Sequence, residues 1–227
     1  MTTEVQISSN NRNQFPFFLL LIGVCLPLQI FALLAVAISQ NGEGLPFDVP
    51  LLSAIHDTAK PQLDIFASFF TQFGYLKGII PTVLFIALVL AFRQQWHRFV
   101  YFLITVFGSF FIVFTTKLVF HRARPHLWSI FLPLPSDYSF PSGHSGLSMM
   151  LFVALVNLSW GTRWCKWVMI VGGLFVVGIG WTRLYLGVHY PSDVLAGWML
   201  AIAWGIGVNL SFHFPLVKLI TRKQDYP

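Results

Sequence analysis

Long apolar runs separated by short polar segments make up most of this chain. The first run extends from Phe15 to Ser39, carries no charged residue and exceeds the roughly 20 residues that a helix needs to cross a bilayer. It is too long for the apolar core of a cleavable signal, so we interpret it as a retained membrane helix. Similar runs follow, and the pattern predicts an all-α bundle of six transmembrane helices. The predicted spans are 15–39, 75–92, 99–120, 143–160, 166–183 and 193–213.

Residues 41–74 form a sizeable segment that is not a predicted span. Asp48 is placed there to cap a helix that carries Pro50 in its first turn. Apolar residues then recur at helical spacing, at Leu63, Phe66, Phe70 and Phe73. This spacing predicts an interfacial helical segment between the first two spans, with its apolar face toward the lipid, or a helix partly buried against the bundle.

The composition supports an integral membrane protein. Of the 227 residues, 56% are hydrophobic and only 10% are charged, whereas soluble domains carry about 25% charged residues. Cys25 lies in the first apolar run and Cys165 in a basic loop, so we expect no disulfide between them. The net charge of +6 is of the kind that orients a membrane protein, and we expect no nucleic-acid partner.

The distribution of Lys and Arg predicts the orientation. Six spans would place both chain ends on one side, and more basic residues lie on that side than on the other. The excess of Lys and Arg on that side becomes pronounced once four basic residues with another expected role are left out of the count: Lys117, Arg122, Arg124 and Arg183. We therefore expect a disordered cytoplasmic N-terminus (1–14), one membrane domain (15–214) and a cytoplasmic tail (215–227).

Three polar segments interrupt the apolar pattern and fall at the same, outward membrane face in this topology. They are KLVFHRARP (117–125), SFPSGHS (139–145) and TRLYLGVHYPSD (182–193). Ionisable groups at membrane depth are costly and usually line a cavity or a pathway. The three segments together therefore indicate a site.

The cations of these segments predict an anion-binding site. Lys117, Arg124 and Arg183 would repel one another unless an anion lay among them, and both side-chain types suit phosphate oxygens. Pro141 and Gly143 suit a helix start that offers backbone N–H groups and a favourable dipole to an anion.

The histidines indicate chemistry as well as binding. Asp193 follows His189 by four residues, so in a helical turn its carboxylate can accept a hydrogen bond from one ring nitrogen and leave the other nucleophilic. His144, from another segment, is suited to protonate a leaving oxygen. This set predicts phosphoryl transfer through a phosphohistidine. Taken alone, the His–Asp pair also fits a capping pair or a metal site. Against a metal, adjacent cations would repel it, and Asp137 is the one further carboxylate nearby that could serve as a ligand.

The three motifs resemble the type 2 phosphatidic acid phosphatase superfamily of membrane lipid phosphatases. That family has Lys, six residues, Arg-Pro; then Pro-Ser-Gly-His; then Ser-Arg, five residues, His, three residues, Asp. This chain reads Lys117…Arg124-Pro125, Pro141-Ser142-Gly143-His144 and Thr182-Arg183…His189…Asp193. Thr182, in place of Ser, departs from the pattern but retains a hydroxyl.

The resemblance implies a role for each matching residue. His189 would be the nucleophile, Asp193 its orienting partner and His144 the acid. The phosphate-binding residues would be Lys117, Arg124, Ser142, Gly143 and Arg183. The family uses no metal or other cofactor, so we expect none. Outside the motifs, we interpret His121, Arg122, His126 and Asp137 as candidate headgroup contacts, and His56, His97 and His213 as structural or interfacial.

We therefore expect a phosphatase whose partners are membrane lipids and whose substrate is a lipid phosphate or diphosphate. Phosphatidate, phosphatidylglycerol phosphate and undecaprenyl diphosphate are the candidates, with the site on the extracytoplasmic face of a bacterial plasma membrane. Two alternatives from other classes are an anion transporter or channel and a catalytically inactive lipid-binding relative. Vanadium haloperoxidases have a related pocket, but they are soluble proteins and disagree with the six predicted spans. Sugar-phosphate phosphatases of internal membranes are a further branch that the sequence does not exclude.

Overall fold

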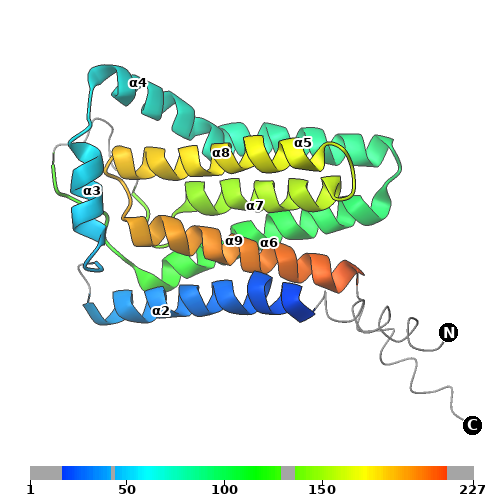
Figure 1. Ribbon diagram of the computed structural model, residues 1–227, viewed down its shortest axis with the longest axis horizontal. Coiled ribbons are helices and arrows are strands. Elements are labelled where there is room, and N and C mark those ends of the chain that lie inside the picture. Colours follow the sequence, from blue (N-terminus) through cyan, green and yellow to red (C-terminus); the bar gives the residue numbers. More distant parts are fainter. Residues whose placement is uncertain (1–16, 42–43, 129–135, 214–227) are drawn as a thin grey trace, which may run out of the picture.

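The computed structural model describes residues 17–41, 44–128 and 136–213, and all regular elements within these ranges are helical (Figure 1). This confirms the predicted all-α class. The elements are η1 (Leu21–Cys25), α2 (Leu26–Asn41), α3 (Asp48–His56), α4 (Pro61–Phe70), η2 (Thr71–Gly74), α5 (Leu76–Phe92), α6 (Trp96–Phe120), α7 (Gly143–Ser159), α8 (Cys165–Tyr185) and α9 (Pro191–His213).

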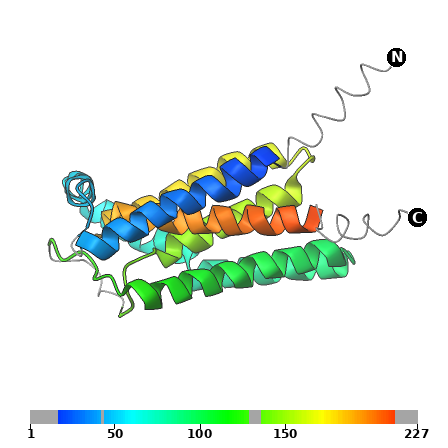
Figure 2. The same cartoon turned by 90° about the horizontal axis from the view of Figure 1, so that it is seen from below.

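The long helices run side by side along the longest axis of the molecule, and α7 and α9 occupy the middle (Figure 1). Helix α7 contacts α6, α8 and α9, while α9 lies between α2 and α6 (Figure 2). The core between these helices is apolar and includes the fully buried side chains of Phe102, Met150 and Ala154. Helix α3 lies across one end of the bundle (Figure 1).

Glycines allow α7 and α9 to approach closely at the end that α3 covers. A Cβ atom on Gly197 of α9 would lie 2.7 Å from the carbonyl oxygen of Ser142 and 3.0 Å from the amide nitrogen of Gly146. Such contacts are too short for a side chain, so the start of α7 packs directly on the α9 backbone. The backbone N–H of Ser142 also donates to the carbonyl of Asp193, at 2.9 Å.

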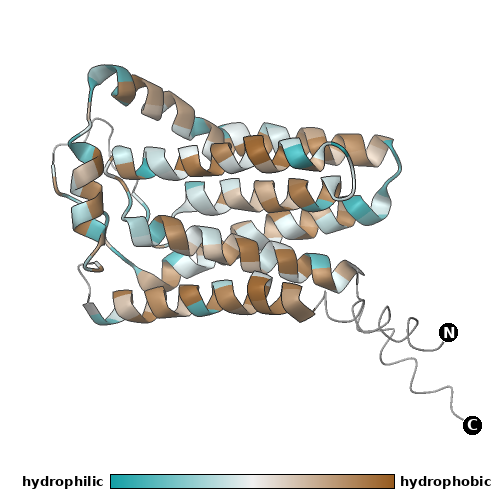
Figure 3. Cartoon of the chain, in the orientation of Figure 1, coloured by the Kyte–Doolittle hydropathy of each residue, from teal (hydrophilic) through white to brown (hydrophobic). Residues whose placement is uncertain are grey.

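The helices carry the surface of a membrane protein. Large apolar side chains such as Phe85, Phe92 and Phe107 are exposed, and hydrophilic residues gather at the two ends of the bundle (Figure 3). Among the described residues, five helical stretches are long and apolar enough to cross a membrane by length and composition: Phe17–Gln40, Pro61–Phe92, Trp96–Phe120, Cys165–Tyr185 and Pro191–Phe212. Helix α7 coincides with the remaining predicted span but, with 17 residues, is shorter than these five.

The segment before α5 differs in detail from its prediction. Phe47, not Asp48, occupies the N-cap position of α3, and the carboxylate of Asp48 turns into the protein, where it is fully buried. Helix α4 packs against α8, and the Tyr185 hydroxyl donates to Asp64 Oδ1 at 2.7 Å. The face of α4 around Ala67 is buried against the end of α8. Ile65, Phe66 and Phe69 of the same helix are exposed, so the interfacial segment stays a prediction.

Candidate active site

The three polar segments meet at the end of the bundle that α3 covers. The Ser139 N–H donates to the carbonyl of Arg122 at 2.8 Å, which joins the first segment to the second. The Ser142 N–H bonds the Asp193 carbonyl, which joins the second to the third. The predicted co-location on one face of the bundle is confirmed.

A cavity of about 660 Å³ opens among these segments. One wall is polar and holds six of the predicted site residues: Lys117, Arg124, Gly143, His144, Arg183 and His189. The lining also includes apolar side chains from α6 and α7, here called the apolar wall: Phe110, Val113, Phe114, Leu118 and Leu147. Phe110 and Phe114 are also among the exposed large apolar side chains of the molecule.

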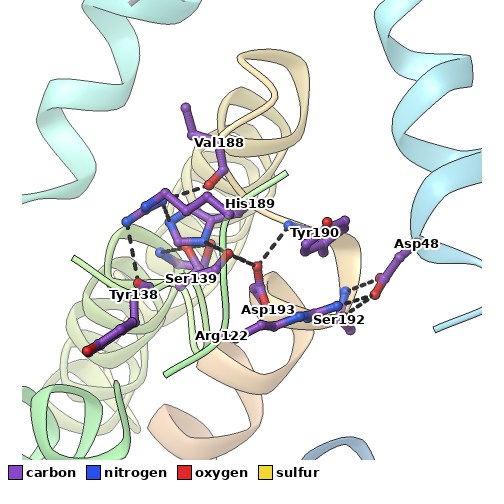
Figure 4. A network of polar contacts seen from close by, with 12 residues as sticks. Asp48, Arg122, Tyr138, Ser139, Val188, His189, Tyr190, Ser192 and Asp193 are labelled. Carbon is purple, nitrogen blue, oxygen red and sulfur yellow. Dashed lines mark hydrogen bonds and ion pairs between the residues drawn. The ribbon is translucent and has the colours of Figure 1, made fainter. Parts of the chain in front are cut away.

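The imidazole of His189 is held from both sides. Its Nε2 lies 3.0 Å from Nη1 of Arg124. Because a guanidinium can only donate, Nε2 must be the unprotonated nitrogen, and the proton of the neutral ring must lie on Nδ1. Nδ1 faces Oδ2 of Asp193 and the hydroxyl of Ser139, each at 3.4 Å (Figure 4). The one lone pair of Nε2 therefore accepts the Arg124 N–H, and both residues line the cavity.

The first turn of α9 places Asp193 behind this ring. The N–H groups of Asp193 and Val194 donate to the Tyr190 carbonyl, and Oδ2 of Asp193 accepts the Tyr190 N–H at 2.9 Å, which is half of a capping box. The same oxygen accepts the Ser139 hydroxyl at 2.5 Å. The predicted helical turn between His189 and Asp193 is therefore present, and its capping bonds orient the carboxylate.

The three cations converge on the cavity, yet each already has a protein partner. Lys117 Nζ lies 2.8 Å from Oδ2 of Asp137, and Arg124 donates to the other oxygen of the same carboxylate. Nη1 of Arg183 donates to Thr71 Oγ1 at 2.7 Å, while its buried Nε has no partner among the described residues. Asp137 thus bridges Lys117 and Arg124, two of the residues that the sequence predicts to bind phosphate.

Charges around the cavity set the protonation of its polar groups. Burial, together with the positive charges of Arg124, Arg183 and Lys117, holds the pKa of His189 well below its usual value. Burial raises the pKa of Asp137, but the hydrogen bond and charge of Lys117 and the charge of Arg124 outweigh it, and the pKa lies below its usual value. Near neutral pH the site therefore combines a neutral imidazole with an ionised carboxylate.

The model of the PAP2 superfamily matches residues 98–215, which contain all three motifs. The chain belongs to the PAP2 superfamily. It is 29% identical to the undecaprenyl-diphosphatase of Sulfolobus acidocaldarius, over 85% of this chain and 93% of that protein. It is 30% identical to phosphatidylglycerophosphatase B of Bacillus subtilis, over 76% of this chain and 86% of that protein.

Solved structures of PAP2 proteins share the fold. The crystal structure of a transmembrane PAP2-type phosphatidylglycerolphosphate phosphatase from Bacillus subtilis aligns with a TM-score of 0.71 at 23% identity, over 88% of this chain and 98% of that chain. The crystal structure of Aquifex aeolicus LpxE aligns with a TM-score of 0.62 at 25% identity, over 74% and 97%. The resemblance inferred from the motifs is thus confirmed at the level of the family.

Ser142 and Thr182, the two hydroxyl residues of the PAP2 motifs, do not line the cavity. The Ser142 hydroxyl is fully buried at the N-cap of α7, where it accepts from the Ser145 hydroxyl at 3.0 Å. Its contribution to the site is therefore indirect: it caps the start of α7, where the first N–H groups have no acceptor within the helix. The Thr182 hydroxyl donates to the Ile179 carbonyl at 2.6 Å, so the hydroxyl at this position, where the family has Ser, bonds within α8.

The residues interpreted as headgroup contacts divide into three cases. Arg122 contradicts the interpretation, because its side chain is only 1% exposed and pairs with Asp48 and Asp193, away from the cavity. Asp137 lines the cavity. His121 and His126 are exposed, and neither is among the lining residues; His121 contacts the edge of the Tyr138 ring.

The other histidines and the cysteines lie outside the site. His56 stacks on Trp128 and His97 contacts Phe212, in agreement with a structural role, while the side chain of His213 lies outside the described residues. Cys25 and Cys165 are both free thiols. Within the described ranges, no three His, Cys, Asp or Glu side chains come together as a metal site.

Sequence reasoning missed several residues that the structure adds. Tyr75 stacks on His144 with ring centroids 4.5 Å apart, and Thr71 holds Arg183. Ser139 bridges His189 and Asp193, although its place beside the Pro-Ser-Gly-His motif was a usable signal. Asp48 lies far away in sequence, and no local pattern connects it to the site.

Proposed function

We propose that this PAP2 protein is a membrane phosphatase that hydrolyses lipid phosphates or diphosphates through a phosphohistidine on His189. The observation that carries the proposal is the unprotonated Nε2 of His189, 3.0 Å from Arg124, in a cavity that is also lined by the apolar wall. The relatives named undecaprenyl-diphosphatase and phosphatidylglycerophosphatase B support the substrate class.

Two displacements at phosphorus complete the reaction. In the first, the Arg124 N–H moves from Nε2 of His189 to a phosphate oxygen, and the freed lone pair of Nε2 attacks phosphorus. The bond to the leaving oxygen breaks, and His144 donates a proton to that oxygen. In the second, His144 takes a proton from water, the water oxygen attacks phosphorus, and the nitrogen–phosphorus bond breaks to release inorganic phosphate. Lys117, Arg124, Arg183 and the N–H groups at the start of α7 stabilise the negative oxygens in both steps.

The proposed substrate enters from the side of the bundle. Its phosphate would meet the cations while its chain lies along the apolar wall formed by Phe110, Phe114 and Leu147.

We also propose that α7 crosses the membrane as the sixth span. Both chain ends would then be cytoplasmic and the site would face outward, in the plasma membrane. Membrane-impermeant labelling of single cysteines introduced at Thr58 and Gly161 tests this, because only Thr58 should react in intact cells.

A substrate panel tests the function. Purified protein would be assayed with phosphatidate, lysophosphatidate, phosphatidylglycerol phosphate and undecaprenyl diphosphate, without added metal and with EDTA. We expect phosphate release from at least one lipid, and no loss of rate with EDTA. Absence of release from every lipid, together with anion flux in vesicles that survives His189→Ala, would instead favour a transporter.

The Asp137 carboxylate should compete with substrate phosphate. It binds Lys117 and Arg124, and its side chain is 46% exposed, so the ion pairs are partly screened by solvent. We expect Asp137→Asn to lower KM, and the concentration of vanadate that halves activity, by about fivefold at similar kcat. A higher KM would show instead that Asp137 assists substrate binding.

The activity should follow a bell-shaped pH profile. His189 must be neutral to attack, and its lowered pKa means that activity is lost only as pH falls below the usual histidine value of about 6.5. His144 must carry a proton to release the leaving group, so activity also falls as pH rises through its pKa. Measurement of kcat/KM against pH checks both limbs, and a flat profile from mildly acidic to mildly alkaline pH contradicts this division of roles.

A further inference from the structure

Arg122 lies behind the active site, on the side of Asp193 that faces away from the cavity. Its Nη1 donates to Asp193 Oδ1 at 2.5 Å and to Ser192 Oγ at 2.8 Å. Its guanidinium also lies 4.2 Å from the centre of the Tyr190 ring. With one oxygen of Asp193 held by Arg122, the other is left to face Nδ1 of His189 (Figure 4).

Asp48 holds Arg122 in turn. This first residue of α3 is fully buried, and its Oδ2 accepts from Nη2 of Arg122 at 2.8 Å. The carboxylate also accepts the N–H and the hydroxyl of Ser192, at 2.9 and 2.6 Å, and the N–H of Leu45 at 3.0 Å. Asp48 therefore joins α3 to the first turn of α9 and to the segment after α6.

The charges of this group are unusual for a buried position. A lone Arg122–Asp193 pair would be neutral and would screen the carboxylate from His189. With Asp48 included, two carboxylates and one guanidinium carry a net charge of −1. Buried ionic groups are costly and contribute little net stability, which leaves a role in specificity or function as the better reason for this one.

We propose that Arg122 and Asp48 are positioning residues for the phosphoryl transfer: Arg122 fixes the carboxylate of Asp193 toward His189, and Asp48 cancels the Arg122 charge so that the group stays net negative. The inference rests on the proposed function. The ring of His189 gains positive charge as Nε2 bonds to phosphorus, and a net negative group beside Nδ1 stabilises that charge. Arg122 lies between Lys117 and Arg124 of the first motif but is not one of its specified positions, and Asp48 lies outside all three segments.

Charge-changing substitutions separate this role from a purely structural one. Asp48→Asn leaves the group neutral, Arg122→Gln makes it −2, and the double variant restores −1. The ionisable groups around His189 are Lys117, Arg124, Asp137, His144, Arg183 and Asp193, and none is altered in these variants. Asp64→Asn is the matched control, because Asp64 also anchors a helix at this end, through Tyr185.

We expect Asp48→Asn to lower kcat about tenfold or more at similar KM, the size seen for outer partners of functional histidines. Loss of a negative charge also lowers the pKa of His189, so the acid limb of its pH profile should move to lower pH. Arg122→Gln should move that limb to higher pH. The double variant should return the limb toward that of the wild type and recover part of the activity lost in Asp48→Asn.

A structural role predicts a different result. If the network only ties α3 to the bundle, the double variant is the least active of the three, thermal stability falls in parallel, and the acid limb does not move; that outcome overturns the proposal. Arg122→Lys provides a second arm should Asp48→Asn fail to fold. Lysine keeps the positive charge but cannot bind Asp48 and Asp193 at once through two nitrogens, as the guanidinium does. We therefore expect kcat to fall while the acid limb of the pH profile stays in place. An unchanged kcat would also overturn the proposal. An inactive wild type, by contrast, would refute the phosphatase function itself.

Discussion

Replacement of His189 by alanine is expected to abolish turnover, with a loss on the order of 10⁴-fold or more in kcat. The reason is that Nε2 is the nitrogen proposed to form the bond to phosphorus. Lys117, Arg124 and Arg183 still line the cavity in the variant, so phosphate and vanadate should continue to bind. Phosphate release under saturating lipid measures the loss.

The control for this substitution is His97→Ala. His97 lies at the start of α6, at the far end of the bundle, where its ring contacts Phe212. Its variant should retain the wild-type rate. Rapid quenching with radiolabelled substrate should trap label on the wild type and on His97→Ala but not on His189→Ala. Substantial activity in His189→Ala, or label that persists in it, would assign the nucleophile to another residue.

Asp193→Asn should cost on the order of 10³–10⁴-fold in kcat, with a much smaller change in KM. An asparagine keeps the shape of the side chain but brings an N–H₂ group among the groups that now donate to Asp193: Arg122, Ser139 and the Tyr190 N–H. If that N–H₂ faces His189, it favours the tautomer whose proton lies on Nε2, and this removes the lone pair that we propose attacks phosphorus.

Single-turnover measurements give the clearest reading of this variant, because they report formation of the phosphoenzyme alone. Asp57→Asn, on an exposed residue at the end of α3, serves as the control and should react at the wild-type rate. A loss of less than about tenfold for Asp193→Asn would mean that Ser139 and the backbone orient His189 well enough without the carboxylate.

Local sequence determined the helices and the chemical types of the site residues. Each long apolar run became a helix, because the length and hydrophobicity of such a run favour a helix that satisfies its own backbone in lipid. The motif spacing likewise placed His189 just before a helix start and Asp193 in its first turn, since the pair is fixed by one turn of backbone. Both features depend only on residues close together in the chain.

Only the tertiary structure decided which polar groups face the cavity and which lie behind it. Asp48 and Arg122 are 74 residues apart and meet because α3 folds across the end of the bundle, so the sequence did not reveal that Arg122 lies outside the cavity lining. The pairing of Asp137 with Lys117, and the burial of the Ser142 hydroxyl at a helix cap, depend on the same packing. A side chain's residue type follows from the sequence, but the direction in which it points follows from the elements packed around it.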